Sequence, residues 1–415
     1  MELTLKGANV YVDGHFEIKD LTVNIDVPFS YSHFISDNSV DLTGKYIFPG
    51  FADVHVHLRE PGFSYKETVK SGTEAGAAGG YTALCSMPNL KPPPDSAENL
   101  SIQKDIIAQD AEIAVLPYGT ITVGQAGKEL SDMTGMADAV CGFSDDGKGV
   151  QNEEMMMAAM LKAKALGKII SAHCEDEALL NGGYIHDGEY AKAHGHRGIC
   201  SESEWGPIAR DIELVKKTGC AYHVCHISTK ESVDIIRKAK AEGVNITCET
   251  GPHYLTLCDD DLEEHGRFKM NPPLRSSEDR DALVEGIKDG TIDMIATDHA
   301  PHSDEEKGRG LEKSAMGVVG LETAFPVLYT ELVKKGVITL EKLIDLMSRA
   351  PRARFDIDTD VGFTVFDLDK CYDVDPNNFK TKGRATPFEN KTVFGKCLMT
   401  VYDGKIVYNG LTEDE

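Results

Sequence analysis

The sequence predicts an α/β protein, a (β/α)8 barrel of the TIM type that carries a small β-sandwich module built from the N- and C-terminal segments. Two observations lead to this prediction. Between about Lys45 and Pro351, eight short, apolar, β-branched runs alternate with longer segments of helical character. Both ends of the chain instead contain short strand-like runs separated by turns. A third observation, the polar residues that close most of the eight runs, indicates where a site would lie.

The eight runs are the predicted barrel strands. Helix-like stretches lie between them, for example residues 152–167 (NEEMMMAAMLKAKALG) and 230–243 (KESVDIIRKAKAEG). Eight strand–helix units are the number that closes such a barrel, which typically uses about 250 residues. The runs cover residues 46–58, 80–89, 112–122, 139–147, 168–176, 221–228, 245–253 and 292–302.

The two ends of the chain are predicted to pair into the β module. Residues 3–12 and 13–27 form alternating runs near the N-terminus, and residues 391–410 have the same texture near the C-terminus. The Asp403-Gly404 step between two alternating runs is a typical hairpin turn. We therefore predict that residues 1–45 and 353–415 form the module and that residues 46–352 form the barrel.

Composition narrows the classes of function. Acidic residues outnumber basic ones by 68 to 43, which argues against nucleic acid or an anionic membrane as a partner. The chain has no run of about 18 apolar residues that could span a membrane, and residues 1–10 lack the apolar core of a signal peptide. The ten cysteines include no C-x-x-C pair and resemble reduced core thiols. We expect a cytoplasmic protein with a small-molecule substrate. The substrate can be anionic despite the negative net charge of the chain, because an arginine or a metal ion makes the electrostatic potential inside a cleft positive.

Nearly every predicted barrel strand ends in a side chain that can bind a metal or a substrate. Active sites of such barrels lie at the carboxyl ends of the strands, so these side chains would gather at one mouth. Core strands alone would not share this feature. The residues are His57, Asn89, Asp146, His173, His226, His253 and Asp298.

The first candidate site is the pair His55 and His57 in the segment FADVHVHLREPG. Residues two apart on a strand point to the same side, so both imidazoles would face one point, as ligands of one zinc ion must. The alternative is two inward histidines satisfied by backbone hydrogen bonds. The strand before the pair and the residues Arg59 to Gly62 directly after it favour a site.

Two further candidates each leave a choice between neighbours. Asp145 and Asp146 could bridge two cations, or they could form an acidic turn or helix cap. His223 and His226 are three apart, so only one can face the mouth, and His226 is nearer the end of its run.

The last predicted strand ends in a third group of candidates. Asp298 could touch a metal and also move a proton. His302 follows Pro301 in a loop, where it could reach a substrate. Residues 303–310 could form a mobile lid, although we favour a solvated loop for Ser303 to Lys307.

The segments DVHVHLREPG and ATDHAPHSDEEK resemble the two signatures of the dihydroorotases, within the amidohydrolase superfamily. The segments MPN, FSDDG, AHCED, HIST, MNPPLR and VGLETAFP fit as well, so the resemblance covers nearly the whole chain and is closest to the long bacterial type, class I. It implies reversible cyclisation of N-carbamoyl-L-aspartate to L-dihydroorotate in pyrimidine (UMP) biosynthesis. The chemistry implied is attack by a zinc-activated hydroxide, with Asp298 as general acid and base.

The resemblance also implies the metal ligands, with two zinc ions expected and one as the alternative. Asp146 would bridge the two ions, because it lies 27 residues before His173, the spacing of the family, whereas Asp145 is one residue too far. The first ion would be held by His55, His57 and Asp298, and the second by His173 and His226.

The substrate contacts implied by the resemblance lie close to these ligands. Three groups would hold the substrate carboxylate: Arg59, Asn89 and His302. Asn271 would contact the ring, and the backbone of Met316 and Gly317 would touch the edge of the pyrimidine.

The bridging position distinguishes this chain from related enzymes. Hydantoinases, dihydropyrimidinases and animal dihydroorotases bridge their metals with a carboxylated lysine. Here the segment FSDDG occupies that place and Lys148 falls in the following turn. We therefore predict an aspartate bridge without a modified lysine.

Two other functions stay open. One is another cyclic amidohydrolase, an allantoinase or hydantoinase, against which Arg59, Asn89 and His302 argue because those substrates lack this carboxylate. The other is an inactive dihydroorotase-like scaffold for aspartate transcarbamoylase, against which the complete set of ligands argues. The resemblance further implies a homodimer and an association with aspartate transcarbamoylase as a candidate partnership.

Overall fold

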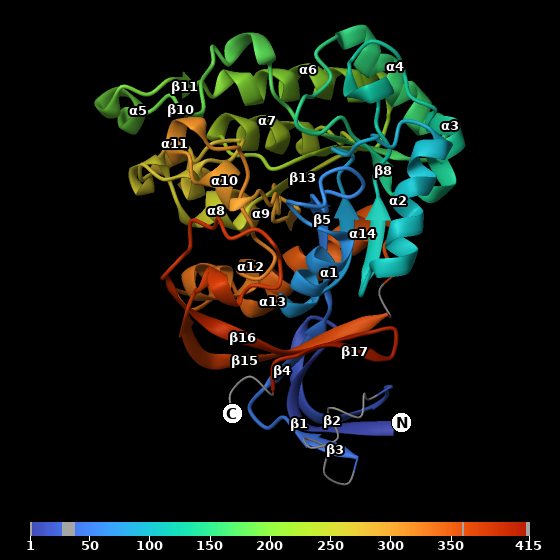
Figure 1. Cartoon of the computed structure of the whole chain (residues 1–415), viewed down its shortest axis with the longest axis vertical. Helices are drawn as coiled ribbons and strands as arrows, with labels where there is room; N and C mark the ends of the chain where they lie inside the picture. The colour runs from blue at the N-terminus through green and yellow to red at the C-terminus, as the bar shows by residue number, and fades with distance from the viewer. Residues whose placement is uncertain (1, 27–37, 359–360, 412–415) are drawn as a thin grey trace.

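The two ends of the chain form one seven-stranded sheet, which lies below the rest of the molecule in Figure 1. The computed structural model describes residues 2–26, 38–358 and 361–411, so the parts of the predicted module at 1, 27–37, 359–360 and 412–415 lie outside the described residues. The strand order is β17-β16-β15-β4-β1-β2, with β3 beside β1. The bounds are β1 (Glu2–Val12), β2 (His15–Asn24), β3 (Ser39–Asp41), β4 (Tyr46–Pro49), β15 (Gly362–Asp373), β16 (Thr392–Tyr402) and β17 (Lys405–Asn409).

Strand β4 joins the two ends. It pairs in parallel with β1, where Tyr46 lies opposite Asn9, and antiparallel with β15, where Phe48 lies opposite Thr364. The predicted pairing of the ends is therefore present, in one hydrogen-bonded sheet of the described strands, and whether this sheet forms a sandwich stays a prediction. One sheet forms because both edges of β4 are occupied. The predicted hairpin is present between β16 and β17.

The predicted domain boundaries fall beside or inside elements of structure. Strand β4 begins at Tyr46, within the predicted barrel segment, yet belongs to the terminal sheet. Helix α14 (Ala350–Phe355) spans the boundary predicted between 352 and 353. Phe355 packs edge-on against Tyr118 and His223 of the central strands. The exact division into two domains stays a prediction.

Eight parallel strands occupy the middle of the chain. They form two hydrogen-bonded sheets, with the orders β5-β6-β7 and β8-β9-β12-β13-β14. Isolated parallel bridges join Gly119 to Phe143 and Val56 to His299, which links the two sheets at both edges. Each predicted run contains one of these strands. Their bounds are β5 (Phe51–Val56), β6 (Tyr81–Ser86), β7 (Ala114–Pro117), β8 (Gly142–Phe143), β9 (Ile169–Ala172), β12 (Tyr222–Val224), β13 (Ile246–Thr250) and β14 (Met294–Ile295).

Helices surround these strands (Figure 1). The two helices predicted at 152–167 and 230–243 are α4 and α7, and the side chains of Asn152 and Thr229 cap their first turns. None of the described helices combines the length and the apolar character of a membrane span. The helices are α1 (Val69–Ala78), α2 (Ala97–Asp110), α3 (Met133–Met136), α4 (Glu153–Ala165), α5 (Glu189–His194), α6 (Glu202–Thr218), α7 (Lys230–Ala241), α8 (Pro252–Thr256), α9 (Ser277–Asp289), α10 (Asp304–Lys307), α11 (Gly310–Lys313), α12 (Ala324–Leu328), α13 (Leu340–Ile344) and α14, and the short strands β10 (Ile185–His186) and β11 (Gly198–Ile199) form a separate pair.

Candidate metal centre and substrate pocket

A cavity of about 230 Å³ lies where the carboxyl ends of the central strands meet. Of the residues to which the family resemblance assigns a metal or substrate role, only His55 does not line this cavity. His55 is fully buried beneath it, in β5. His253, which closes the seventh predicted run, does not line the cavity either: it lies in α8 and packs against Tyr254. The lining residues are His57, Arg59, Asn89, Asp146, Gly147, His173, His226, Asn271, Asp298, Ala300, His302, Met316 and Gly317.

Asp146 lies at the centre of a cluster of histidines. Its two carboxylate oxygens lie 3.3 Å from His55 Nε2 and 3.5 Å from His57 Nε2. On the other side, one of these oxygens lies 3.5 Å from His173 Nδ1 and 3.6 Å from His226 Nε2. Asp146 therefore faces two groups of imidazoles at once.

Asp298 completes the group that contains His55 and His57. Its Oδ1 lies 3.2 Å from His57 Nε2 and 3.5 Å from His55 Nε2. In the other group, His173 Nδ1 and His226 Nε2 are 3.0 Å apart. Two sets of donor atoms thus share the carboxylate of Asp146. We call these residues the Asp146 cluster: His55, His57, Asp146, His173, His226 and Asp298.

These donor sets fit divalent metal ions. Ligand bonds of about 2.0–2.1 Å in a tetrahedral zinc site place neighbouring donor atoms roughly 3.3 Å apart, close to the separations found here. His55 Nε2 and Asp146 Oδ1 are buried without a hydrogen-bond partner among the described residues. Such groups are costly to bury unsatisfied, and a cation between them would satisfy both.

Two residues of the first group have pKa shifts that suit metal ligands, whereas in the second group burial is outweighed by hydrogen bonds to Asp146 and Glu175, which raise the pKa of His173 to about 10. Burial, reinforced by the charge of Arg59, lowers the pKa of His57 and favours the neutral imidazole that binds metal. Burial alone would raise the pKa of Asp298, but the hydrogen bond from His57 and the neighbouring histidines hold it below its ordinary value. Asp298 is therefore an anionic carboxylate.

Two choices left open by the sequence have clear geometric answers. Asp145 points away from the cluster, where it accepts hydrogen bonds from the backbone N–H groups of Ile121 and Thr122, whereas Asp146 points into the cluster. His223 lies deeper than His226 and contacts Glu249. Lys148 is exposed to solvent and lines no part of the cavity.

The backbone at three site residues is held in an uncommon conformation. Arg59, His226 and Asp298 have φ angles of +63°, +33° and +46°. Residues other than glycine rarely adopt positive φ, and they keep such strain where the surroundings enforce it, often at functional sites. Here each of the three lies just beyond the end of a central strand, where the chain turns to present its side chain.

A positively charged corner of the cavity lies beside the Asp146 cluster. His302 Nε2 lies 2.7 Å from the carbonyl oxygen of Met316 and donates its hydrogen there, so His302 Nδ1 accepts from Lys66 Nζ at 3.2 Å. Arg59 Nη2 lies 3.4 Å from the same imidazole. Burial, together with the charges of Arg59 and Lys66, lowers the pKa of His302 to about 3. The imidazole is therefore neutral, and Arg59 and Lys66 supply the charge that attracts an anion.

Two asparagines present unsatisfied amide groups to the cavity. Asn89 donates to the backbone oxygen of Asp146 at 2.7 Å, and Asn271 donates to Glu175 at 2.9 Å. The side-chain oxygen of each is buried without a hydrogen-bond partner among the described residues. A polar ligand would satisfy both.

Sequence relatives identify the family. The chain is 48% identical over 400 residues to a dihydroorotase of Fusobacterium nucleatum, an alignment that covers 94% of this chain and 92% of the relative. The chain belongs to the dihydroorotase family. It is also 50% identical over 381 residues to a dihydroorotase of Anoxybacillus flavithermus, covering 90% and 89% of the two chains. A family model described as dihydro-orotase-like matches residues 44–232.

Solved structures place this dihydroorotase-family chain in a wider fold group. An L-hydantoinase from Arthrobacter aurescens superimposes with a TM-score of 0.86 at 25% identity, over 98% of this chain and 96% of that chain. A dihydropyrimidinase from Brevibacillus agri gives 0.83 at 21% identity, over 99% and 95%. The resemblance stated from the sequence is confirmed, together with a mixed α/β fold that carries a sheet module.

One predicted loop of this dihydroorotase-family chain has a different structure. Residues Asp304–Lys307, expected to be a solvated loop, form α10 with Ser303 as its cap, and Lys307 is buried. Its ammonium donates to the backbone oxygens of Lys269, Ala315 and Gly317 at 3.0, 2.8 and 2.7 Å. Lys307 therefore ties the Met316–Gly317 loop to the rest of the site.

Lys66 and Lys307 were not predicted to contribute to the site. Lys66 lies in a loop well after the first predicted strand, so strand-end position could not mark it. Lys307 is the last residue of the signature segment ATDHAPHSDEEK, which could have singled it out. The stretch around it, residues 302–310, contains no apolar side chain, so the local sequence gave no reason to expect burial.

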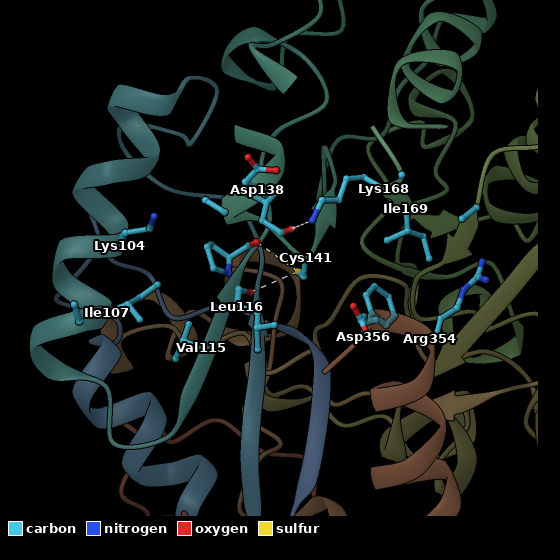
Figure 2. A pocket seen from close by; sticks show the side chains of 17 residues that line it. Lys104, Ile107, Val115, Leu116, Asp138, Cys141, Lys168, Ile169, Arg354 and Asp356 are labelled. Atoms are coloured by element: carbon cyan, nitrogen blue, oxygen red, sulfur yellow. Dashed lines mark hydrogen bonds between the residues drawn. The ribbon is translucent and has the colours of Figure 1, made fainter. Parts of the chain in front are cut away.

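A larger cavity, of about 590 Å³, lies at the opposite ends of the strands (Figure 2). Its walls include Val115, Cys141 and Ile169, near the beginnings of three strands, with Lys168 and Arg354 at its edge. None of the predicted site residues lines it. The Asp146 cluster and the positively charged corner both lie at the smaller cavity, so we take that cavity as the candidate functional site.

Proposed function

We propose that this chain is a zinc-dependent dihydroorotase, which interconverts N-carbamoyl-L-aspartate and L-dihydroorotate in pyrimidine biosynthesis. The observation that carries the proposal is one cavity that combines the Asp146 cluster with Arg59 and His302, whose imidazole Lys66 contacts from outside the lining. The cluster suits hydrolysis of a cyclic amide, and the corner suits a substrate with a carboxylate. Sequence identity of about half to curated dihydroorotases over most of the chain supports the same activity.

The scaffold that we propose for this activity is a closed (β/α)8 barrel. The parallel bridges at both edges of the two central sheets support closure. Barrels of this kind carry their active sites at the carboxyl ends of the strands, which is the side on which the cluster lies.

The metal site that we propose holds two zinc ions. Its ligands are His55, His57 and Asp298 for one ion, His173 and His226 for the other, and Asp146 between them. A bound zinc ion would supply a water molecule activated near neutral pH and would polarise the amide carbonyl.

The protein's own groups would orient the substrate and move the proton. Arg59 donates to the substrate carboxylate, a geometry in which a guanidinium offers two parallel N–H bonds. Asn89 and His302 complete this contact, Asn271 meets the ring, and the backbone of Met316 and Gly317 lies along its edge. During hydrolysis the amide C–N bond breaks, and Asp298 transfers the proton from the attacking water to the leaving ring nitrogen. Ring closure follows the reverse path.

A substrate comparison tests the proposed activity. We expect kcat/KM for dihydroorotate to exceed that for unsubstituted hydantoin by about 10⁴-fold, because a site built around a polar substrate group is left unsatisfied by an analogue without it. Ultraviolet absorbance measures ring opening of both compounds. Comparable values for the two substrates would instead favour a general cyclic amidohydrolase.

Metal removal tests the proposed cofactor. Dialysis against a zinc chelator is expected to lower turnover to background, and added zinc is expected to restore it, because the metal is the group proposed to lower the pKa of the attacking water. Elemental analysis of the untreated protein should give two zinc ions per chain. One zinc ion per chain in an active protein would mean that the proposed activity uses a site for a single ion. A protein with no bound zinc and no turnover would be a scaffold.

The assembly is also a proposal. We propose a homodimer, with aspartate transcarbamoylase as its candidate partner, and sedimentation of the protein alone and mixed with that enzyme measures both. A cytoplasmic location stays a prediction from the sequence.

A further inference from the structure

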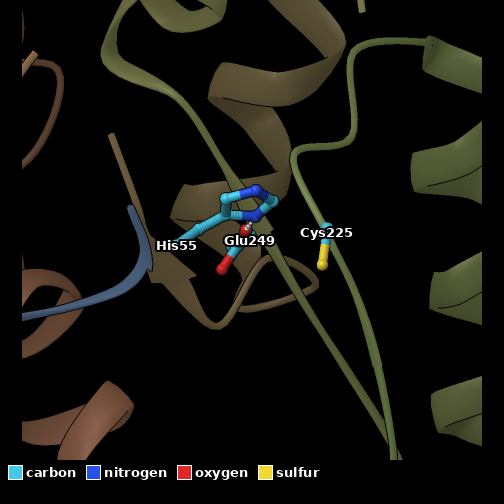
Figure 3. Close-up of side chains that lie close together, drawn as sticks. All are labelled: His55, Cys225 and Glu249. Atoms are coloured by element: carbon cyan, nitrogen blue, oxygen red, sulfur yellow. Dashed lines mark hydrogen bonds and ion pairs between the residues drawn. The ribbon is translucent and has the colours of Figure 1, made fainter. Parts of the chain in front are cut away.

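Glu249 is a buried carboxylate directly beneath the Asp146 cluster. It lies in β13, and only 1% of its surface is exposed. Figure 3 shows its carboxylate against the imidazole of His55, with Cys225 beside them. The Oε1 atom of Glu249 lies 2.7 Å from His55 Nδ1. Glu249 lines no part of the cavity, so its contact is with a ligand and not with the substrate.

The remaining hydrogen bonds of Glu249 fix its own position. Its Oε2 accepts from His223 Nε2 at 3.0 Å, and His223 Nδ1 lies 2.9 Å from Thr247 Oγ1. Its Oε1 also accepts from the backbone N–H of His226 at 3.3 Å. One carboxylate therefore contacts the side chain of one proposed ligand and the backbone of another.

These contacts select one form of His55. An ionised carboxylate only accepts hydrogen bonds, so His55 must carry its hydrogen on Nδ1. The lone pair of His55 Nε2 then faces Asp146 and Asp298, at 3.3 and 3.5 Å. A carboxylate behind a metal-binding histidine fixes both the tautomer and the direction of the ring.

We propose that Glu249 is a positioning residue for both proposed metal positions, because it fixes the tautomer of His55 and holds the backbone of His226. The backbone contact matters because His226 has a φ angle of +33°. The inference rests on the metal site proposed above, and it adds a residue that binds neither metal nor substrate.

A different arrangement would use His55, Cys225 and Glu249 as a separate metal site, since their donor atoms lie within 4.8 Å of one another. The distances argue against it. The 2.7 Å separation of His55 Nδ1 and Glu249 Oε1 is that of a hydrogen bond and is shorter than the roughly 3.3 Å between ligands of one tetrahedral zinc ion. In addition, the other ring nitrogen of His55 already faces the Asp146 cluster.

The first test is the variant Glu249→Gln, which keeps the shape of the side chain. We expect its zinc dissociation constant, measured by competition with a chromogenic chelator, to rise by about 10–100-fold. The visible absorption spectrum of the Co²⁺-substituted protein should change as well. The matched control is Asp211→Asn, because Asp211 is equally buried and accepts from Tyr222 and Arg210, away from the cavity. The control should lower the melting temperature of the metal-free protein but leave zinc affinity and the Co²⁺ spectrum unchanged.

The second test needs no variant. Selective ¹⁵N-histidine labelling of the wild-type zinc protein reports the tautomer of each imidazole by NMR, and His55 is expected to be protonated at Nδ1. Protonation at Nε2, or an unchanged zinc affinity in Glu249→Gln, would overturn the role of Glu249. Wild-type protein that binds no zinc at all would instead overturn the metal site itself, so the two failures are distinguishable.

Discussion

The variant Asp298→Asn is expected to lower kcat by about 10²–10⁴-fold, the usual contribution of a positioned acid–base group. An amide has nearly the same shape as the carboxylate and keeps an oxygen toward His57, from which Asp298 Oδ1 is separated by 3.2 Å. It cannot, however, accept a proton from water and return it to the ring nitrogen. Steady-state ring opening of dihydroorotate measures the loss.

The zinc content of the same Asp298→Asn sample separates the two roles of this residue. If zinc remains bound while kcat falls, proton transfer accounts for the loss. If zinc is lost in proportion to kcat, Asp298 acts mainly as a ligand. Near-normal turnover with full zinc content would contradict its assignment as acid and base.

The variant Arg59→Lys is expected to raise KM for dihydroorotate by about 10–150-fold, because hydrogen bonds to charged groups contribute about 1.5–3 kcal/mol. Lysine keeps the positive charge but loses the planar pair of donors that matches a carboxylate. Burial lowers the pKa of Arg59 to about 10, so its charge persists at neutral pH, and the wild-type KM should rise only as the pH approaches that value. Initial rates over a range of substrate concentrations measure the effect.

The matched control for Arg59 is Arg354→Lys. Arg354 lines the larger cavity at the opposite ends of the strands, where it donates to Asn245. This substitution should leave KM unchanged. A fall in zinc content in Arg59→Lys, without a change in KM, would mean that Arg59 supports the metal cluster and does not bind the carboxylate.

Strand-end position predicted most of the cavity because it is a local property. In a parallel sheet, every strand that ends in a polar residue brings that residue to the same edge, so His57, Asp146, His173 and Asp298 could be grouped without knowing the fold in detail. The same reasoning failed for His253, which lies in α8 and does not line the cavity. A polar residue after a strand therefore shows proximity to the mouth, but not direction.

The supporting residues were harder to predict because their partners are distant in sequence. Glu249 lies in the middle of a strand and contacts His55, 194 positions earlier. Its neighbours in the sequence, in the segment ITCET, look like an ordinary buried strand. Lys66 likewise depends on His302, 236 positions later. Contacts of this kind follow from the closure of the fold and leave no local pattern.

The strands of the terminal sheet could be predicted, but their order could not, because strand neighbours also depend on contacts distant in sequence. Alternating runs at both ends indicated strands, but the alternation does not say which strands are neighbours. The pairing of β4 with both β1 and β15 turns the two ends into one sheet, and a parallel bridge between Asp26 and Lys405 joins the ends a second time.

That pairing has a consequence for synthesis of the chain. The partner of Phe48 in β15 is Thr364, so one edge of β4 stays open until more than three hundred further residues have been made. At about 5–20 residues per second, this takes on the order of tens of seconds. An open strand edge is a template for pairing with other chains. The nascent chain is thus exposed to aggregation at its N-terminal strands for most of its time on the ribosome, and chains truncated before β15 keep that edge permanently.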